Sequence, residues 1–310
     1  MYLVTGGAGF IGSNLVHALV ARGQRVRVLD NLATGRLDNL EPVRGTIEFV
    51  QGDIRSLETC QKALHGVRFV LHQAALPSVP RSFEDPISSS AVNIHGTLNL
   101  LIAARDHKIE RFVYASSSSV YGDTPTLPKV ETMTPDPRSP YAVSKLTGEQ
   151  FCRVFAHAYR LPTVCLRYFN VYGPRQDPTS TYAAVIPRFI RHCLRRTSAT
   201  IFGDGTQSRD FTFVEDCVTA NLLACEEPIS GGEVCNIGSN SRVSIAELYA
   251  MIRRITRSSA SPRFEPPRAG DVKHSLADIT RAKTLLGYSP RYDLESGLSR
   301  TVDWFRSRYE

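Results

Sequence analysis

The sequence predicts an α/β protein with a doubly wound parallel sheet. Short apolar runs rich in β-branched residues recur through the first half of the chain, and stretches of helical length separate several of them. A cluster of glycines directly follows the first run, as is typical of a strand that leads into a helix in such sheets. The expected strands are 2–4, 26–29, 47–50, 69–72, 112–114 and 164–167, and the expected helices between them include 14–22 and 93–106.

After about residue 170 the sequence changes to loops rich in Pro, Gly and Thr. One short strand is expected at 200–202, and helices are expected around 185–196, 243–254 and 294–308. We therefore expect a smaller C-terminal α+β region that packs over the carboxyl edge of the sheet. Open α/β sheets bind their ligands at that edge, so the second region would complete a substrate-binding site.

The composition is that of an ordinary globular protein, with 42% hydrophobic and 22% charged residues among 310. No apolar run approaches the roughly 18 to 20 residues of a membrane helix, so we expect a cytoplasmic protein with no membrane contact. The net charge of +7 is spread along the chain without a long basic block, which argues against nucleic acid. Seven scattered cysteines without a Cys-x-x-Cys pair predict reduced, buried thiols and no metal site.

The first predicted strand runs into the turn Thr5-Gly6-Gly7-Ala8-Gly9-Phe10-Ile11-Gly12. Its spaced glycines allow a tight turn, a close approach of the backbone to a pyrophosphate, and close packing of the next helix, whose N-terminus favours negative charge. Asp30, at the end of the second strand, can accept hydrogen bonds from ribose hydroxyls and repel a 2′-phosphate. These features predict a Rossmann domain that binds NAD rather than NADP. Asp53-Ile54, after the third strand, can border the adenine ring or simply form a strand-to-helix turn.

Tyr141 and Lys145 are four residues apart, which places both side chains on one face of a helix. They follow Ser139-Pro140, a typical helix start, and come after Ser117 in a serine-rich stretch. An ammonium beside the phenol would lower its pKa from about 10, so that Tyr141 could accept a proton near neutral pH. This spacing is also common on ordinary helices, but together with Ser117 and the glycine turn it predicts removal of a hydroxyl proton while hydride leaves the same carbon.

The glycine turn, Ser117 and Tyr141-Ala142-Val143-Ser144-Lys145 together resemble the extended short-chain dehydrogenase/reductases. The similarity narrows to UDP-sugar 4-epimerases in the following stretches: Asp30-Asn31-Leu32-Ala33-Thr34-Gly35, His72-Gln73-Ala74-Ala75, Arg167-Tyr168-Phe169-Asn170-Val171-Tyr172-Gly173-Pro174, Gly203-Asp204-Gly205, Ser208-Arg209-Asp210-Phe211 and Arg268-Ala269-Gly270-Asp271. This resemblance implies an isomerase whose retained NAD takes a hydride from C4 of the sugar and returns it to the other face. It divides the chain into residues 1–170, mainly the NAD-binding domain, and 171–310, mainly the nucleotide-sugar-binding region, with some chain crossing.

The resemblance also implies roles for individual residues. Tyr141 would be the base, Lys145 its activator and a nicotinamide-ribose ligand, and Ser117 the partner of the sugar O4. The other implied cofactor contacts are Gly6, Gly9, Phe10, Ile11, Gly12, Asp30, Asn31, Ala33, Thr34, Gly35, Asp53, Ile54, Gln73, Ala74, Ala75, Asn93 and Phe169. The implied substrate contacts are Ser117, Ser118, Tyr141, Asn170, Gln176, Ala184, Val185, Arg209, Arg268, Asp271 and Ser275. Arg209 and Arg268 resemble diphosphate ligands, although each could instead form a surface ion pair with the nearby Asp210 or Asp271.

The resemblance gives a partial indication of the sugar. Ser275 aligns with a position where a large Tyr excludes N-acetyl groups in related 4-epimerases, so the small side chain predicts room for an acetamido group. Four other stretches resemble the acetamido-sugar branch: 78–82, 127–131, 175–178 and 182–187. Pro77 is a departure, because that branch commonly has Gly at this position. We therefore expect activity on UDP-N-acetylglucosamine and UDP-N-acetylgalactosamine as well as on UDP-glucose and UDP-galactose. UDP-glucuronate is an alternative, because Arg81, Arg175 or Arg188 could meet a C6 carboxylate.

Other chemistries on the same scaffold lose support at Ser118-Ser119. Dehydratases of this type carry an acid and a base there, usually Asp-Glu, and decarboxylases carry a Glu at the second position. A non-catalytic NAD-binding sensor or scaffold is an alternative of another class. The resemblance also implies a homodimer formed through two helices, for which the apolar faces around 94–104 and 143–155 could serve, unless they pack on the sheet.

Overall fold

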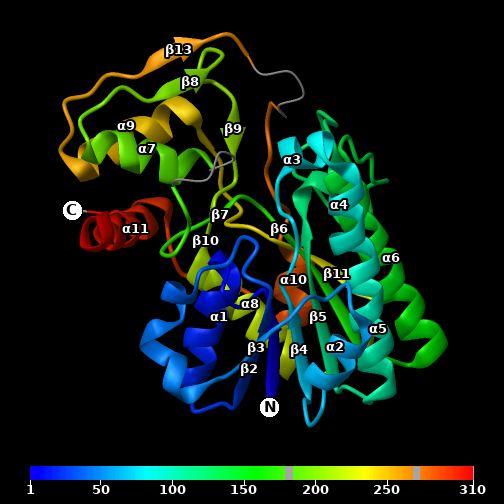
Figure 1. Cartoon of the computed structure of the whole chain (residues 1–310). Coiled ribbons are helices and arrows are strands. Elements are labelled where there is room, and N and C mark those ends of the chain that lie inside the picture. Colours follow the sequence, from blue (N-terminus) through cyan, green and yellow to red (C-terminus); the bar gives the residue numbers. More distant parts are fainter. Residues whose placement is uncertain (179–183, 268–272, 310) are drawn as a thin grey trace.

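The computed structural model describes residues 1–178, 184–267 and 273–309, and its centre is a seven-stranded parallel sheet (Figure 1). Across the sheet the strands are β3 (Glu48–Gln51), β2 (Val26–Asp30), β1 (Tyr2–Thr5), β4 (Phe69–His72), β5 (Arg111–Ser117), β6 (Thr163–Tyr168) and β11 (Glu233–Ile237). The chain order reverses between β1 and β4, and sheets of this kind bind ligands at the carboxyl ends beside such a reversal. The predicted doubly wound sheet is confirmed.

Helices cover both faces of the sheet, because most of its strands are apolar on both sides. One face carries α1 (Phe10–Ala21), α8 (Val214–Glu226) and α10 (Thr280–Leu286). The other carries α2 (Leu57–Ala63), α5 (Thr97–Asp106) and α6 (Pro140–Tyr159). Each face has its own buried core, with Leu15 and Val218 in one and Leu100 and Cys152 in the other.

The segment after β4 forms short helices before it reaches α5. These are α3 (Val79–Glu84), α4 (Pro86–Ser90) and a π-helical turn over Ala91–Gly96. The predicted helix over 93–106 therefore begins as this wider turn, and such turns are frequent at functional sites.

A second, smaller layer lies above the carboxyl ends of the strands (Figure 1). Its helices are α7 (Val185–Leu194), α9 (Ile245–Thr256) and α11 (Leu294–Tyr309), which pack around a third core that includes Phe189, Tyr249 and Phe305. Three strand pairs complete it: β7 (Val171–Tyr172) with β10 (Thr212–Phe213), β9 (Ser208–Arg209) with β12 (Val243–Ser244), and β8 (Thr200–Phe202) with β13 (Arg263–Glu265).

The second half of the chain also returns to the sheet, where it supplies α8, α10 and the edge strand β11. The sequence patterns predicted neither α8 nor β11. Most of α8 is buried, including the polar Asp216 and Asn221, so it lacks the one-sided apolar stripe that reveals a surface helix. All seven cysteines are free and buried, as expected. Within the described ranges, no helix has the length and apolar character needed to cross a membrane.

Candidate active site

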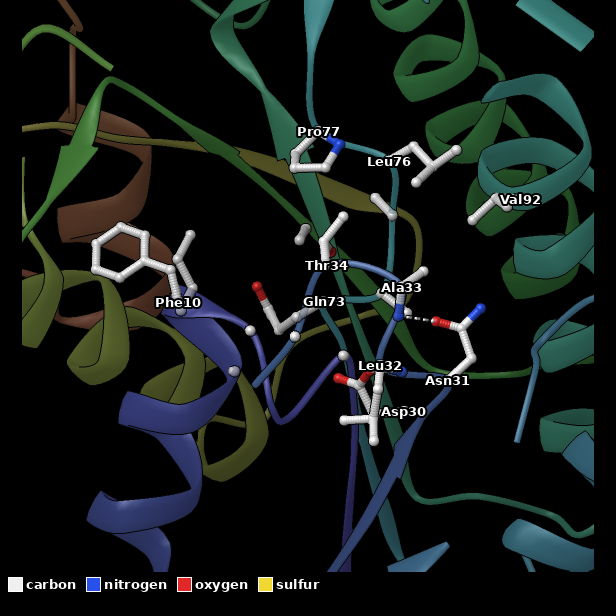
Figure 2. Close-up of a pocket in the computed structure, with 18 of the residues that line it drawn as sticks. Phe10, Asp30, Asn31, Leu32, Ala33, Thr34, Gln73, Leu76, Pro77 and Val92 are labelled. Atoms are coloured by element: carbon white, nitrogen blue, oxygen red, sulfur yellow. Dashed lines mark hydrogen bonds between the residues drawn. The ribbon is translucent and has the colours of Figure 1, made fainter. Parts of the chain in front are cut away.

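A cavity of about 950 Å³ lies where β1, β2, β3 and β4 end. Figure 2 shows Phe10, Thr34 and Gln73 reaching its wall from three different segments. The predicted cofactor residues that line it are Gly6, Gly9, Phe10, Ile11, Gly12, Asp30, Asn31, Ala33, Thr34, Gly35, Asp53, Ile54, Gln73, Ala74, Ala75, Tyr141 and Lys145. Segments that are far apart in the sequence thus meet at one edge of the sheet.

The glycine turn leaves space only for glycine at two of its positions. Gly6 has a positive φ of 65°, which side chains other than glycine rarely adopt. A Cβ on Gly12 would lie 2.1 Å from the carbonyl oxygen of Gly6. The turn enters α1 without a side-chain cap, so backbone N–H groups at the helix N-terminus are available to an anion.

Asp30 is buried and held by two backbone N–H groups. One carboxylate oxygen accepts a hydrogen bond from the N–H of Ala8 at 3.0 Å, and the other accepts from Leu32 at 2.8 Å. Burial raises the pKa of Asp30, while these two hydrogen bonds oppose the rise. Asp30 therefore joins the glycine turn to the loop after β2, a structural role beside the expected ribose contact.

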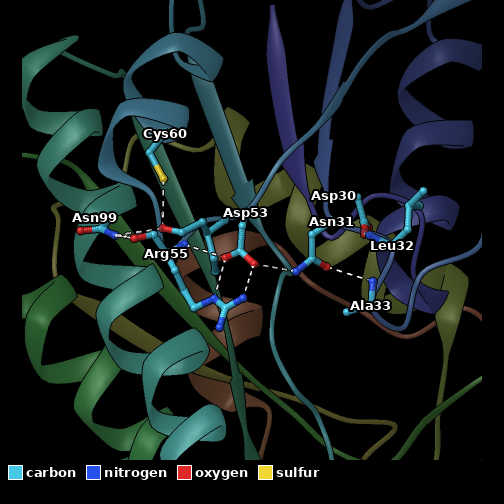
Figure 3. Close-up of polar contacts among 9 residues, drawn as sticks. Asp30, Asn31, Leu32, Ala33, Asp53, Arg55, Cys60 and Asn99 are labelled. Carbon is cyan, nitrogen blue, oxygen red and sulfur yellow. Dashed lines mark hydrogen bonds and ion pairs between the residues drawn. The ribbon is translucent and has the colours of Figure 1, made fainter.

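Asp53 is held in a polar network at the border of the cavity (Figure 3). Arg55 donates to both of its carboxylate oxygens, at 3.0 and 2.8 Å, and the Asn31 amide donates to one of them at 2.8 Å. The Arg55 hydrogen bonds are the main reason that the pKa of Asp53 falls to about 2. Asp53 is thus a fixed carboxylate that lines the cavity and also shapes the strand-to-helix turn.

Two predicted cofactor residues lie behind the cavity wall. Asn93 is buried, accepts a hydrogen bond from the N–H of Leu76 at 2.8 Å and donates to the Ser144 hydroxyl at 3.1 Å. It therefore ties the loop after β4 to α6. Phe169 is fully buried and packs beside the ring of Tyr121.

Of the three predicted catalytic residues, Tyr141 and Lys145 line the cavity, and Ser117 lies beside its wall, directly after the lining residue Ser116. Ser117 is the last residue of β5, and Tyr141 is the second residue of α6, whose N-terminus is capped by Ser139. The Ser117 hydroxyl lies close enough to the Tyr141 phenol to lower its pKa. The ammonium of Lys145 is buried and donates to the carbonyl oxygen of Ala115 at 2.8 Å. Because Tyr141 and Lys145 line the same cavity as the glycine turn, one space joins the dinucleotide site to a candidate proton acceptor.

The electrostatics of Tyr141 and Lys145 differ from the expectation based on spacing. Burial raises the pKa of Tyr141 to about 12, and the nearby Ser117 hydroxyl only opposes this rise. Burial likewise lowers the pKa of Lys145 to about 8, opposed by the charge of Glu149. The ammonium of Lys145 lies 5.8 Å from the centroid of the Tyr141 ring and bonds to a backbone carbonyl instead. Desolvation therefore sets the direction of the Tyr141 pKa shift, in place of the lowering by Lys145 that the sequence suggested.

A second cavity, of about 300 Å³, lies in the upper layer. Four of the predicted substrate residues line it: Asn170, Ala184, Val185 and Arg209. Its other walls are largely apolar and include Phe189, Phe202 and Phe211, which suits a flat base.

The remaining predicted substrate residues divide into three groups. Gln176 lines the first cavity, and Ser118 is half-buried directly after Ser117. Ser275 is buried beside Asn170. Arg268 and Asp271 lie outside the described residues.

The sequence left open a surface ion pair between Arg209 and Asp210, but Asp210 does not lie at the surface. Its carboxylate is fully buried and accepts hydrogen bonds from the backbone and hydroxyl of Ser239 and from the N–H of Ala277. Burial raises the pKa of Asp210. Arg209 donates to the carbonyl oxygens of Ser208 and Lys273 and lines the second cavity, where a cation can meet a diphosphate.

Some lining residues were not predicted from the sequence. Trp304 and Arg308, on the C-terminal helix α11, line the first cavity together with Leu32 and Asp177. Arg308 donates to the carbonyl oxygen of Asp38 at 3.2 Å. A helix was expected over 294–308, but no local motif marks Trp304 and Arg308 as cavity residues. Their contribution depends on how the upper layer folds back over the sheet.

Comparison with known proteins agrees with this geometry. Residues 2–238 match the model of the NAD dependent epimerase/dehydratase family. A UDP-glucose 4-epimerase of Mycolicibacterium smegmatis is 40% identical over 310 residues, covering 99% of this chain and 98% of its own. The chain belongs to the NAD-dependent epimerase/dehydratase family, among its UDP-sugar 4-epimerases.

Solved structures of the UDP-sugar 4-epimerases match the whole fold. The UDP-N-acetylglucosamine 4-epimerase of Methanobrevibacter ruminantium M1, in complex with UDP-N-acetylmuramic acid, is 39% identical with a TM-score of 0.95; the match covers 99% of this chain and 98% of that one. The UDP-glucuronic acid 4-epimerase of Bacillus cereus, in complex with UDP-glucuronic acid and NAD, is 38% identical with a TM-score of 0.92 and covers 99% of each chain.

Membership of this 4-epimerase family confirms that the chain is an isomerase and uses NAD. The residues fit the cofactor: the glycine turn leaves space for a pyrophosphate, and the carboxylates of Asp30 and Asp53 stand in the wall of a cavity of suitable size. The chain is therefore an enzyme and not the non-catalytic NAD-binding scaffold considered as an alternative.

Proposed function

We propose that Tyr141, Lys145 and Ser117 carry the C4 epimerisation of a UDP-sugar, and that the chain accepts acetamido sugars as well as plain hexoses. The observation that supports this proposal is the first cavity, which contains both the glycine turn and Tyr141. The substrate nucleotide would occupy the second cavity, between Asn170 and Arg209.

The proposed chemistry depends on a proton held at the Tyr141 phenol oxygen. The residues of the first cavity would hold NAD, which would supply a hydride acceptor and a positive charge that favours phenolate. Tyr141 then takes the proton of the sugar 4-hydroxyl, while the Ser117 hydroxyl hydrogen bonds to the same oxygen and orients it. Lys145 adds a second positive charge, 5.8 Å from the centroid of the Tyr141 ring. After rotation of the sugar, Tyr141 returns its proton to the sugar oxygen as the hydride returns to the other face of C4, so no net oxidation results.

The acetamido proposal is supported by the small, buried Ser275. Its hydroxyl accepts a hydrogen bond from the amide of Asn170, which lines the second cavity. A serine leaves space where a larger side chain would meet the 2-substituent of the sugar. The similar enzyme from M. ruminantium, a UDP-N-acetylglucosamine 4-epimerase, has the same fold.

UDP-glucuronate is the second candidate substrate. Arg81 and Arg175 line the first cavity and Arg188 lines the second, so cations are present in both. The similar enzyme from B. cereus acts on UDP-glucuronic acid. Against this candidate, Asp177 places a carboxylate in the wall beside Gln176, where it would repel a second negative charge.

Initial rates with the UDP forms of glucose, N-acetylglucosamine and glucuronate test these substrates directly. We expect comparable rates on the first two and a much lower rate on the third. Activity on UDP-glucose alone would refute the acetamido proposal. A highest rate on UDP-glucuronate would instead favour the uronate candidate.

We further propose a homodimer formed through an apolar strip on α3, α4 and α6. Its exposed side chains are Phe83, Ile87, Val143 and Val154, and these helices pack together on one side of the molecule (Figure 1). Val143 and Val154 are three helical turns apart and share one face. In the other expected stretch, 94–104, Leu100, Leu101 and Ala104 are buried against the sheet, whereas Ile94, Leu98 and Ile102 are half-buried.

Light scattering with Ile87→Glu tests this homodimer. We expect a monomer for Ile87→Glu and an unchanged dimer for Phe264→Glu, a matched control at an exposed phenylalanine on β13. A monomeric wild-type protein would refute the proposal.

A cytoplasmic location is the remaining part of the proposed function. Fractionation of cells that express the chain would test it, and recovery with the membrane fraction would contradict it.

A further inference from the structure

A buried ion pair lies directly behind the candidate catalytic residues. Glu149 is on α6, one turn after Lys145 and two turns after Tyr141, on the same side of the helix. The guanidinium of Arg167, on β6, donates to its two carboxylate oxygens at 2.8 and 2.7 Å. The side chains are only 4% and 3% exposed. This bidentate geometry fixes both groups more firmly than a single hydrogen bond would.

The same carboxylate also holds the strand that carries Ser117. The hydroxyl of Ser116 donates to Glu149, and the ammonium of Lys145 donates to the carbonyl of Ala115. α6 is therefore bonded to the end of β5 at two successive residues, immediately before Ser117. These bonds set how far Ser117 lies from Tyr141.

Arg167 extends the connection toward the substrate side. Its guanidinium stacks over the ring of Tyr121 at 4.7 Å, and the Tyr121 hydroxyl donates to Asn236 at 2.7 Å. Arg167 also lies three residues before Asn170, and Asn170 lines the second cavity. The ion pair thus connects three elements that meet at the site: α6, β5 and β6.

A buried ion pair is weak support for stability, because the desolvation of both charges offsets their attraction. Its position next to a buried lysine suggests another purpose. The groups that the structure relates directly to Lys145 are His72 from β4, Tyr114 from β5, and Tyr141 and Glu149 on α6. The elements packed against α6 carry further titratable groups: Tyr121, Cys165 and Arg167, besides Cys152 on α6 itself. Burial lowers the pKa of His72 to about 3 and raises that of Tyr114 well above 10, so both are uncharged near neutral pH. Glu149 is the anion that opposes the desolvation of Lys145.

We propose that Glu149 and Arg167 are positioning residues for the epimerisation: Arg167 holds Glu149, and Glu149 keeps Lys145 charged and Ser117 in register with Tyr141. This inference rests on the proposed roles of Tyr141 and Lys145. Neither Glu149 nor Arg167 would contact the substrate, so their effect is exerted through Lys145 and the end of β5.

The pH dependence of turnover tests the proposal, with Glu149→Gln as the variant. Gln has the same shape and can still accept from Ser116, but it lacks the charge. In the wild-type protein turnover should fall at alkaline pH as Lys145 loses its proton. In the variant this alkaline limb should move to lower pH by about one pH unit or more, because an opposing charge has been removed. A uniform loss of turnover with an unmoved limb would overturn the proposal.

Glu131→Gln is the matched control. Glu131 is a half-buried carboxylate of the same region that accepts a hydrogen bond from the N–H of Asn236. Its variant should keep the alkaline limb of the wild-type protein. Glu149→Asp, which retains the charge, should also keep the limb while losing part of the turnover. A shift of the limb in Glu131→Gln equal to that in Glu149→Gln would contradict a specific role for Glu149.

Two further measurements separate the possible failures. Glu149→Gln alone leaves Arg167 as an unpaired buried cation and could fail to fold, so a double variant with Arg167→Met removes both charges. In the double variant the alkaline limb should move in the same direction as in Glu149→Gln. An unmoved limb in a folded double variant contradicts the proposal. Bound NAD, measured after release by heating, reports a folded site. If Tyr141→Phe retains full turnover, the proposed function itself fails; if Tyr141→Phe is inactive and the limb stays unmoved, only the role of Glu149 fails.

Discussion

The side-chain amide of Asn170 donates a hydrogen bond to the hydroxyl of Ser275 at 3.3 Å, although 105 positions separate the two residues. Asn170 lines the second cavity and is further fixed by donation to the carbonyl oxygen of Asp210 at 2.8 Å. This hydrogen bond joins Ser275 to the wall of the second cavity, and the proposed role of Ser275 in the choice of sugar can be tested through it.

Ser275→Tyr should lower the rate on UDP-N-acetylglucosamine much more than the rate on UDP-glucose, by about tenfold or more in the ratio of the two. The added ring would fill the space beside Asn170 and break its hydrogen bond. Steady-state rates on both substrates measure this ratio, with Ser275→Ala as the control that loses only the hydrogen bond. An equal loss on both substrates would show that Ser275 does not control the choice of sugar.

Tyr141→Phe should lower turnover by at least about 10²-fold, the usual contribution of a general base, without loss of bound NAD. The phenyl ring keeps the packing of α6 but cannot take a proton from the 4-hydroxyl. Epimerisation rate and NAD content should both be measured. Tyr159→Phe, at the exposed end of the same helix, is the control and should behave as the wild-type protein. Tyr141 is not the base if its variant keeps normal turnover.

Gly12→Ala should abolish NAD binding and lower the melting temperature. The added Cβ would lie 2.1 Å from the carbonyl oxygen of Gly6, so the turn would have to open. Gly45→Ala provides a matched control, because a Cβ at that position meets open space. NAD content and thermal unfolding of the two variants give the comparison. Retention of NAD by Gly12→Ala would mean that the turn adapts to a side chain.

His72 should make the protein less stable as the pH falls. It is buried between the hydroxyls of Thr5 and Thr97, at 2.8 and 2.9 Å, and burial lowers its pKa from 6.5 to about 3. Between these values the unfolded chain binds a proton that the folded protein does not. The contribution of His72 to the free energy of unfolding is therefore present above pH 6.5 and is lost toward pH 3, at up to about 1.4 kcal/mol per pH unit.

Urea unfolding at pH 7 and at pH 5 measures this loss. His72→Gln should show a smaller decrease between the two pH values than the wild-type protein does. His157→Gln, at an exposed histidine on α6, serves as the control and should keep the wild-type decrease. The same decrease in His72→Gln would assign the acid sensitivity to other groups.

The sequence predicted most of the elements that position the site. Six of the seven strands of the sheet and the turn between β1 and α1 follow from short apolar runs and from glycine spacing, both of which are local properties. Asp30 and Tyr141 were found in the same way, since each lies at a fixed distance from the end of a strand or the start of a helix. β11 escaped prediction because five residues carry too little pattern, and α8 escaped because it is buried on most sides.

Local spacing therefore determined the fold class, the NAD site and the candidate catalytic residues of this protein. Only the tertiary structure decided that Trp304 and Arg308 reach the cofactor cavity, that Asn170 meets Ser275, and that burial raises the pKa of Tyr141. The physical reason is that backbone geometry is encoded by neighbouring residues. Desolvation and contacts between distant segments depend instead on which surfaces the folded chain brings together.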